Sequence, residues 1–150
     1  MTAIFIGLLA TAVMDAWAWI QKRLFNIPSL DYRLIGRWLL GMKKGQWQHH
    51  TIIQSPVLKG EIVLGWLAHY VLGAVLAVIY CALLNEISLL SAWLWGVVTL
   101  VLPFLIMQPA FGFGFAAAKT PSPNTARWRS FVAHSSFGIG IWIAAKILGV

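Results

Sequence analysis

The chain has 150 residues, of which 60% are hydrophobic and 10% are charged, and its mean hydropathy is +0.80. Soluble domains carry about 25% charged residues, so this composition excludes an ordinary soluble globule. The net charge is +7, but its placement along the chain follows membrane topology, so we expect no nucleic-acid partner. The single cysteine, Cys81, excludes an intrachain disulfide and a cysteine-based zinc site within one chain.

The first predicted element is a spanning helix at about residues 2–21, since about 20 mostly apolar residues are needed to cross a bilayer. One acidic residue, Asp15, interrupts this apolar run. No basic residue precedes the run, whereas Lys22 and Arg23 follow it, which is the reverse of a signal peptide. We therefore expect a retained first span.

A loop at about residues 22–61 follows, and part of it has helical periodicity. Apolar residues recur there at three-to-four-residue spacing, a pattern that predicts an amphipathic helix at about residues 30–42. We expect this helix to lie in the cytoplasmic interface, with the cations Arg33 and Arg37 near anionic lipid.

The remainder of this loop, from Gly45 to Gly60, predicts irregular structure. It contains the adjacent residues His49 and His50. We interpret them as a solvated polar pair, and a surface metal site is the alternative.

The second and third spans are predicted at about residues 62–84 and 92–117, joined by a short turn around Asn85. The third span contains Pro103 and Pro109. Each proline lacks a backbone donor, so we expect this helix to be kinked or partly opened.

A rigid, turn-like loop at about residues 118–128 leads to a fourth span at about 129–148. Ten of the eleven basic residues lie in the first and third loops. These are Lys22, Arg23, Arg33, Arg37, Lys43, Lys44 and Lys59, then Lys119, Arg127 and Arg129. The excess of cations in cytoplasmic loops places both loops in the cytoplasm and both termini outside.

Each span carries a polar residue that is costly in hydrocarbon. These residues are Asp15, His69, Gln108 and His134. At about 1.5 Å of rise per residue they lie roughly 8–16 Å from the loop ends of their spans, within the cytoplasmic half of a core about 30 Å thick. Together with Tyr70 they form the candidate set for binding a ligand or an ion.

Several kinds of chemistry suit this set. Two imidazoles and a carboxylate can bind a divalent transition metal, so Asp15, His69 and His134 are candidate metal ligands. The same groups can relay a proton near neutral pH. Haem, with the two histidines as axial ligands, is a subsidiary variant. The competing interpretation is structural, with the polar residues serving as interhelical hydrogen-bonding groups.

A faint internal repeat relates the second and fourth spans. His69 precedes Gly73 by the same spacing as His134 precedes Gly138. Such a two-plus-two duplication would place the two histidines around a pseudo-two-fold axis along the membrane normal.

Five segments stand out in combination: Pro28-Ser29-Leu30-Asp31-Tyr32, Gly36-Arg37-Trp38, Gly65-Trp66-Leu67-Ala68-His69-Tyr70, Met107-Gln108-Pro109-Ala110 and Lys119-Thr120-Pro121-Ser122-Pro123. The combination resembles a family of small bacterial four-span membrane proteins catalogued only as a domain of unknown function. The resemblance covers nearly the whole chain and implies a bacterial inner-membrane protein of this size and topology. It implies no reaction, ligand or catalytic residue.

The sequence thus predicts an all-α membrane protein, with a single transmembrane domain over residues 1–150. It has four transmembrane helices, a cytoplasmic interfacial amphipathic helix and a proline-kinked third span. The favoured function is a small transporter that moves a proton, metal ion or small solute past Asp15, His69 and His134. A structural or accessory subunit and a membrane-embedded metal- or haem-binding enzyme are the alternatives, and the enzyme is the less favoured. A transporter this small is expected to form a homo-oligomer.

Overall fold

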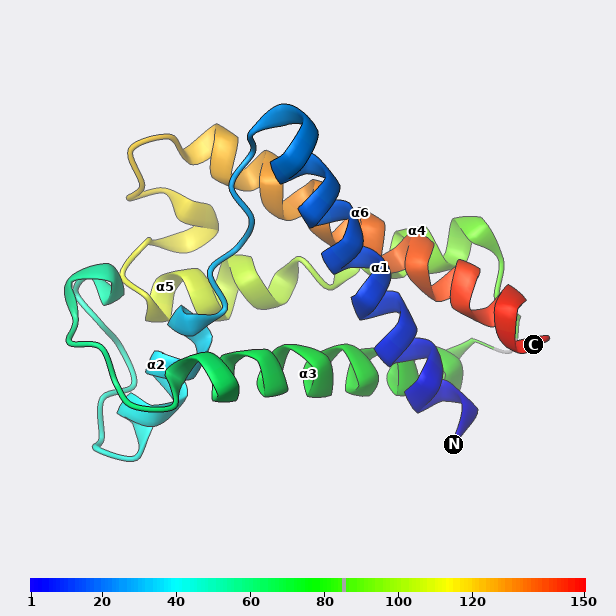
Figure 1. Cartoon of the computed structure of the whole chain (residues 1–150), viewed down its shortest axis with the longest axis horizontal. Helices are drawn as coiled ribbons and strands as arrows, with labels where there is room; N and C mark the ends of the chain where they lie inside the picture. The colour runs from blue at the N-terminus through cyan, green and yellow to red at the C-terminus, as the bar shows by residue number, and fades with distance from the viewer. Residues whose placement is uncertain (85) are drawn as a thin grey trace. The chain divides into compact units, whose positions relative to one another are not determined.

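Helices account for all regular secondary structure in residues 1–84 and 86–150, which the computed structural model describes (Figure 1). The α-helices are α1 (Thr2–Phe25), α2 (Arg33–Met42), α3 (Glu61–Leu83), α4 (Leu89–Val98), α5 (Gln108–Ala110) and α6 (Pro123–Leu148). Two 3₁₀ turns, Ile52–Gln54 and Phe115–Ala117, and a π-helix, Leu102–Met107, complete the set.

Four helical stretches among the described residues are long and apolar enough to cross a membrane. They are α1, α3, α6 and the stretch Leu89–Ala110. The predicted all-α fold with four such helices is therefore confirmed. The turn predicted around Asn85 lies outside the described residues.

The boundaries differ from the predictions at several places, and two of them lie in the loops. The helix predicted at 30–42 is present, but it begins at Arg33. The last helix begins at Pro123 and not near residue 129, so the prediction of a loop over all of 118–128 is wrong. Proline has no backbone N–H, and the first helical position needs none, so Pro123 starts the helix well.

The third span is interrupted, as its two prolines predicted. Regular α-helix ends at Val98, and a π-helix begins at Leu102. Inside it the hydrogen bonds join residues five apart, as when the Gln108 N–H donates to the Pro103 carbonyl. The helical stretch ends at Ala110, whereas we had predicted that it would extend to residue 117.

The described chain divides into two compact units. The first unit consists of Met1–Leu30, Tyr70–Thr99 and Phe131–Val150, and the second consists of Asp31–His69 and Leu100–Ser130. That residues 1–150 form a single domain stays a prediction.

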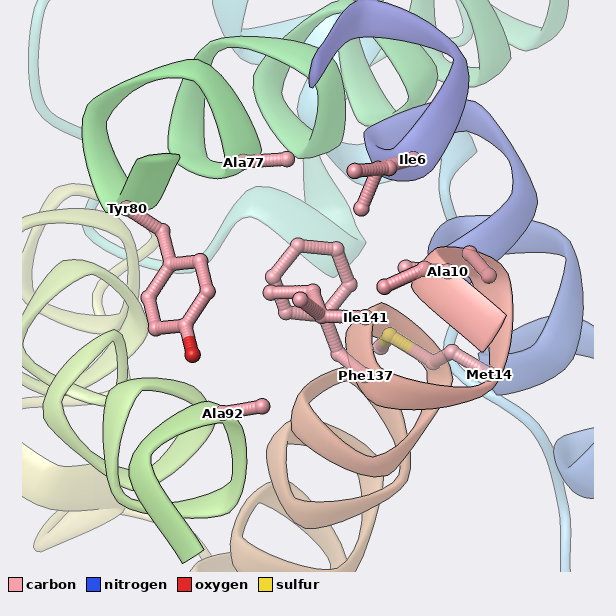
Figure 2. Packing of buried hydrophobic residues seen from close by; sticks show 10 residues of the cluster. Ile6, Ala10, Met14, Ala77, Tyr80, Ala92, Phe137 and Ile141 are labelled. Atoms are coloured by element: carbon pink, nitrogen blue, oxygen red, sulfur yellow. The ribbon is translucent and has the colours of Figure 1, made fainter. Parts of the chain in front are cut away.

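The core of the first unit is built from one face of each of four helices. α1 contributes Ile6, Ala10 and Met14, which recur every four residues and so lie on one face. Figure 2 shows these side chains pointing towards Phe137 and Ile141 of α6 and towards residues of α3 and α4. The remaining core residues are Ala77, Tyr80, Ala92, Ala144 and Ala145.

Small residues bring the helices of the first unit into close contact. At Gly7 a Cβ would overlap the backbone of α3 at Ala74, and at Gly96 a Cβ would overlap the His134 carbonyl on α6. Gly73 and Gly138, the positions matched by the internal repeat, lie at the same two crossings. Small residues at such crossings are typical of packed membrane helices, because they let two backbones approach closely.

In the second unit, α2 packs directly on the first turns of α3. A Cβ at Gly36 would overlap the Glu61 carbonyl, and a Cβ at Gly65 would overlap the Tyr32 carbonyl. The two glycines therefore make this crossing possible. An amphipathic helix was predicted correctly here, but α2 turns Gly36 and Arg37 towards protein, where both are buried.

Candidate functional site: polar pairs on the spanning helices

Asp15 is paired with Tyr70 in the first unit. Gly7, Thr11 and Asp15 recur every four residues, and this face of α1 meets α3 at Gly73. At the end of the face, the Tyr70 hydroxyl of α3 is hydrogen-bonded to the Asp15 carboxylate. Asp15 lies about 15 Å from the C-terminal end of α1, and Tyr70 lies about 14 Å from the N-terminal end of α3. Each distance is roughly half the thickness of a bilayer core.

His134 is paired with Thr99, also in the first unit. The Thr99 hydroxyl donates to the Gly96 carbonyl at 2.6 Å, and its oxygen lies 2.7 Å from His134 Nδ1. The Thr99 hydroxyl therefore links the backbone of α4 to the His134 ring, and the roles of donor and acceptor in the second bond follow the tautomer of His134.

We predict that Thr99→Val lowers the free energy of unfolding by about 1 kcal/mol, because Nδ1 of His134 loses its hydrogen-bond partner. Thr99→Ser keeps the hydroxyl and is the matched control. Detergent unfolding curves give the stability, and ¹⁵N chemical shifts of the His134 ring report whether its protonated nitrogen changes. Equal stability of the valine and serine variants would contradict the assignment.

His69 lies in an aromatic cluster of the second unit. Its ring stacks on Tyr32, with centroids 4.0 Å apart and planes inclined by 21°. Trp66 meets both rings edge-on, at 4.7 Å from Tyr32 and 6.1 Å from His69. Tyr32 comes from the start of α2, and the sequence reasoning did not identify it as a partner of His69.

Gln108 follows the π-helix in the second unit. Its amide nitrogen lies 3.4 Å from the hydroxyl of Ser130, which is buried. Its amide oxygen is buried and has no hydrogen-bond partner among the described residues. Gln108 thus contributes an acceptor in an interrupted span.

A buried ion pair, Arg37 with Glu61, was missed by the sequence reasoning. Arg37 Nε and Nη2 each lie 2.8 Å from one carboxylate oxygen of Glu61, and both side chains are almost fully buried. The hydrogen bonds to Glu61 raise the pKa of Arg37 above its ordinary value, which keeps it charged. The prediction that Arg37 faces anionic lipid is therefore wrong.

His49 was also misjudged, because it is only 4% exposed, whereas its neighbour His50 is exposed. Ser55 Oγ lies 2.9 Å from His49 Nδ1, and Gln46 Nε2 lies 3.2 Å from the same atom. Burial lowers the pKa of His49, and the positive charge of Arg37 lowers it further. The solvated-pair interpretation holds for His50 alone.

The predicted set of polar residues is thus divided among different partners. Asp15 bonds with Tyr70, His134 with Thr99 and Gln108 with Ser130, while His69 stacks on Tyr32. Over residues 1–84 and 86–150, no three His, Cys, Asp or Glu side chains gather closely enough to hold a metal ion. The metal site at Asp15, His69 and His134 gains no support from this geometry, and the haem variant stays a prediction.

Comparison with known proteins places the chain in a family. No curated protein and no solved structure matches the chain. A family model described as "Protein of unknown function (DUF2938)" matches residues 4–148. This match agrees with the resemblance noted from the sequence, and it covers nearly the whole chain. The chain belongs to the DUF2938 family of proteins of unknown function.

Proposed function

We propose that the protein is a small membrane transporter of protons, and that the Asp15 carboxyl group binds the transported proton. The observation that carries the proposal is the bond between Asp15 on α1 and Tyr70 on α3. An ionisable residue inside a spanning helix is costly and usually serves an ion or proton pathway. A tyrosine hydroxyl stabilises the carboxylate without adding a compensating charge.

Protonation of Asp15 would change the contact between α1 and α3. The ionised carboxylate can only accept a hydrogen bond, whereas the protonated form can also donate one. Tyr70 can take either role, so the bond can reverse its direction when a proton arrives. His134 supplies a second titratable group in the same unit, held in place through Nδ1 by Thr99.

We further propose a bacterial inner-membrane location, with both termini outside and the two basic loops in the cytoplasm. The distribution of lysine and arginine supports this orientation. Exposed cations such as Lys43, Lys44 and Lys59 are available to anionic lipid headgroups. A second copy of the chain would help to enclose a transport path, so we propose a homo-oligomer.

Proton flux into liposomes tests the role of Asp15. Wild-type protein should raise the initial rate of proton uptake under an imposed pH gradient, relative to protein-free liposomes. Asp15→Asn should return the rate to that of protein-free liposomes, because an amide cannot exchange the proton. A pH-sensitive dye trapped inside the liposomes reports the rate.

Asp31→Asn is the matched control, because it makes the same substitution at an exposed carboxylate that pairs with Arg33. This variant should transport as the wild type does. Proton transport through Asp15 is ruled out if the wild type adds no flux, or if Asp15→Asn keeps the wild-type rate.

A structural or accessory subunit is the second candidate, and the bonds between helices favour it. The Tyr80 hydroxyl on α3 lies 2.7 Å from Ser91 Oγ on α4, and Trp95 Nε1 donates to the Leu76 carbonyl at 3.1 Å. Such bonds hold helices together without any ligand. This function predicts that Asp15→Asn lowers stability but leaves proton flux at the level of protein-free liposomes, as in the wild type.

A further inference from the structure

The loop at residues 46–55, which we call the loop clasp, is bonded to the end of the interrupted third span. The His49 N–H donates to the Ala110 carbonyl at 2.8 Å, and the Ile52 N–H donates to the Phe111 carbonyl at 3.0 Å. Gly112 packs so closely on the His50 carbonyl that a Cβ would overlap it. These contacts, all within the second unit, fix the chain where the third span ends.

The Arg37–Glu61 pair holds the other side of the loop clasp. Arg37 Nη1 donates to the carbonyls of Ile52 and Ser55, at 3.0 and 3.1 Å. Glu61 accepts a further bond from the Leu58 N–H at 3.0 Å. The clasp therefore joins α2 and the start of α3 to the end of the third span.

The His49 ring is buried and contacts two other residues of the loop clasp, Gln46 and Ser55. Two groups meet its Nδ1, and one of them, the Gln46 amide nitrogen, can only donate. Nδ1 therefore carries a lone pair, and a neutral ring carries its proton on Nε2. Nε2 is buried, has no hydrogen-bond partner among the described residues, and faces Gly41 of α2.

We propose that the loop clasp is a proton-sensitive latch, and that protonation of His49 releases residues 46–55 from the end of the third span. A proton added to Nδ1 would point at the Gln46 amide and remove the bond from that group. The charged ring would also remain buried without an acceptor at Nε2, which is unfavourable.

The charges around His49 also disfavour protonation of its ring in the closed loop. Arg37 approaches from α2 and is positive, and Glu61 at the start of α3 is already paired with it. The groups found next to the two ring nitrogens are uncharged: Ser55 and Gln46 at Nδ1, and Gly41 of α2 near Nε2. None of them offers a negative charge to a protonated ring.

The sign of the pH dependence follows from the lowered pKa of His49. Above the ordinary histidine value of 6.5, the ring is neutral in both the closed and the released loop. As the pH falls below 6.5, the released loop takes up a proton first, so closure is progressively lost until the pH reaches the lowered pKa of the closed form. The loss is at most about tenfold per pH unit, because one proton is bound.

Hydrogen–deuterium exchange on the full chain in detergent micelles tests the latch between pH 8 and pH 5. The measured quantity is the protection factor of the amides in residues 46–55, after correction for the intrinsic pH dependence of exchange. In the wild type, we expect this protection factor to be constant above pH 6.5. Below pH 6.5 it should fall by up to about tenfold per pH unit, as expected for the binding of one proton. Amides in the middle of α3 should show no such step.

Two variants test whether the fall in protection below pH 6.5 comes from the His49 ring. His50→Gln alters the exposed neighbour and should leave the step unchanged, whereas His49→Asn should remove it. Because asparagine could itself loosen the loop, the wild-type and His50→Gln profiles decide the outcome on their own. The proposal is overturned if the wild type shows no step, if His50→Gln abolishes it, or if His49→Asn retains it. The readout is amide exchange, so its result is independent of whether the protein transports protons.

Discussion

Arg37→Ala is expected to lower the free energy of unfolding by about 3–5 kcal/mol, because it leaves the Glu61 carboxylate buried and without its cation. The loss extends beyond the ion pair. Arg37 also donates to the carbonyls of Ile52 and Ser55, which would lose that donor. Unfolding in mixed detergent micelles, followed by circular dichroism, measures the change.

Arg33→Ala is the matched control for this substitution. Arg33 is on the same helix and also pairs with a carboxylate, Asp31, but this pair is exposed to solvent. Exposed pairs contribute little to stability, so we expect no measurable change. Replacing Arg37 and Glu61 together by apolar residues of similar volume should restore part of the loss, because no charge is then left buried. The importance of the pair is refuted if Arg37→Ala and Arg33→Ala unfold alike.

Gly36→Ala is expected to displace α2 from α3 and to lower the free energy of unfolding by about 1–3 kcal/mol or more. The added methyl group would overlap the Glu61 carbonyl, which is backbone and cannot rotate away. Because Glu61 is at the start of α3, the same displacement should weaken its bonds to Arg37. The variant should therefore also expose residues 46–55 to faster amide exchange.

Gly41→Ala, on the same helix, is the control. A Cβ there would lie 3.4 Å from the Gln46 carbonyl oxygen and 3.5 Å from His49 Nε2, which is close to ordinary van der Waals contact. Alanine also favours a helix over glycine by about 1 kcal/mol. We therefore expect Gly41→Ala to be neutral or stabilising. A Gly36→Ala variant as stable as Gly41→Ala would show that α2 does not pack on α3 through Gly36.

The spanning helices could be predicted from the sequence because their signal is local. Length and apolar composition are sufficient to find four stretches, and the ends of α1 and α3 fall close to the predicted ones. The start of α6 was missed because Pro121, Ser122, Pro123 and Asn124 follow one another there, a composition that favours a turn. The position of Pro123 at the start of a helix was the available signal.

The placement of the loop after α1 could not be predicted, because its partners are distant in the sequence. Arg37 and Glu61 are 24 positions apart, and their pairing depends on the crossing of α2 and α3 at Gly36 and Gly65. A periodicity analysis identifies the apolar face of α2 but cannot say whether protein or lipid covers the other side. The four carboxylates in the chain were the best available clue, since a buried cation needs one of them.

The sequence named the polar residues of the candidate site but not the partners that the structure gives them. Asp15 and Tyr70 were both named from the sequence. The four-residue spacing of Gly7, Thr11 and Asp15 could have shown that these three residues of α1 lie on one face. His69 was expected near other polar residues, but it stacks on Tyr32. Depth along a helix follows from residue counting, whereas the direction of a side chain depends on how helices rotate against one another.

The π-helix at Leu102–Met107 interrupts the α-helical repeat of the third span. A π-turn holds about one residue more than an α-turn, so the residue numbering across it does not follow the 3.6-residue α-helical repeat. Leu89–Val98 and Gln108–Ala110 therefore cannot be drawn on a single helical wheel. Gln108, the first residue after the π-helix, has its amide nitrogen 3.4 Å from Ser130 Oγ. Deleting one residue within Leu102–Met107 should restore a regular α-helix and leave Gln108 facing Ser130, because the π-turn already takes up the extra residue.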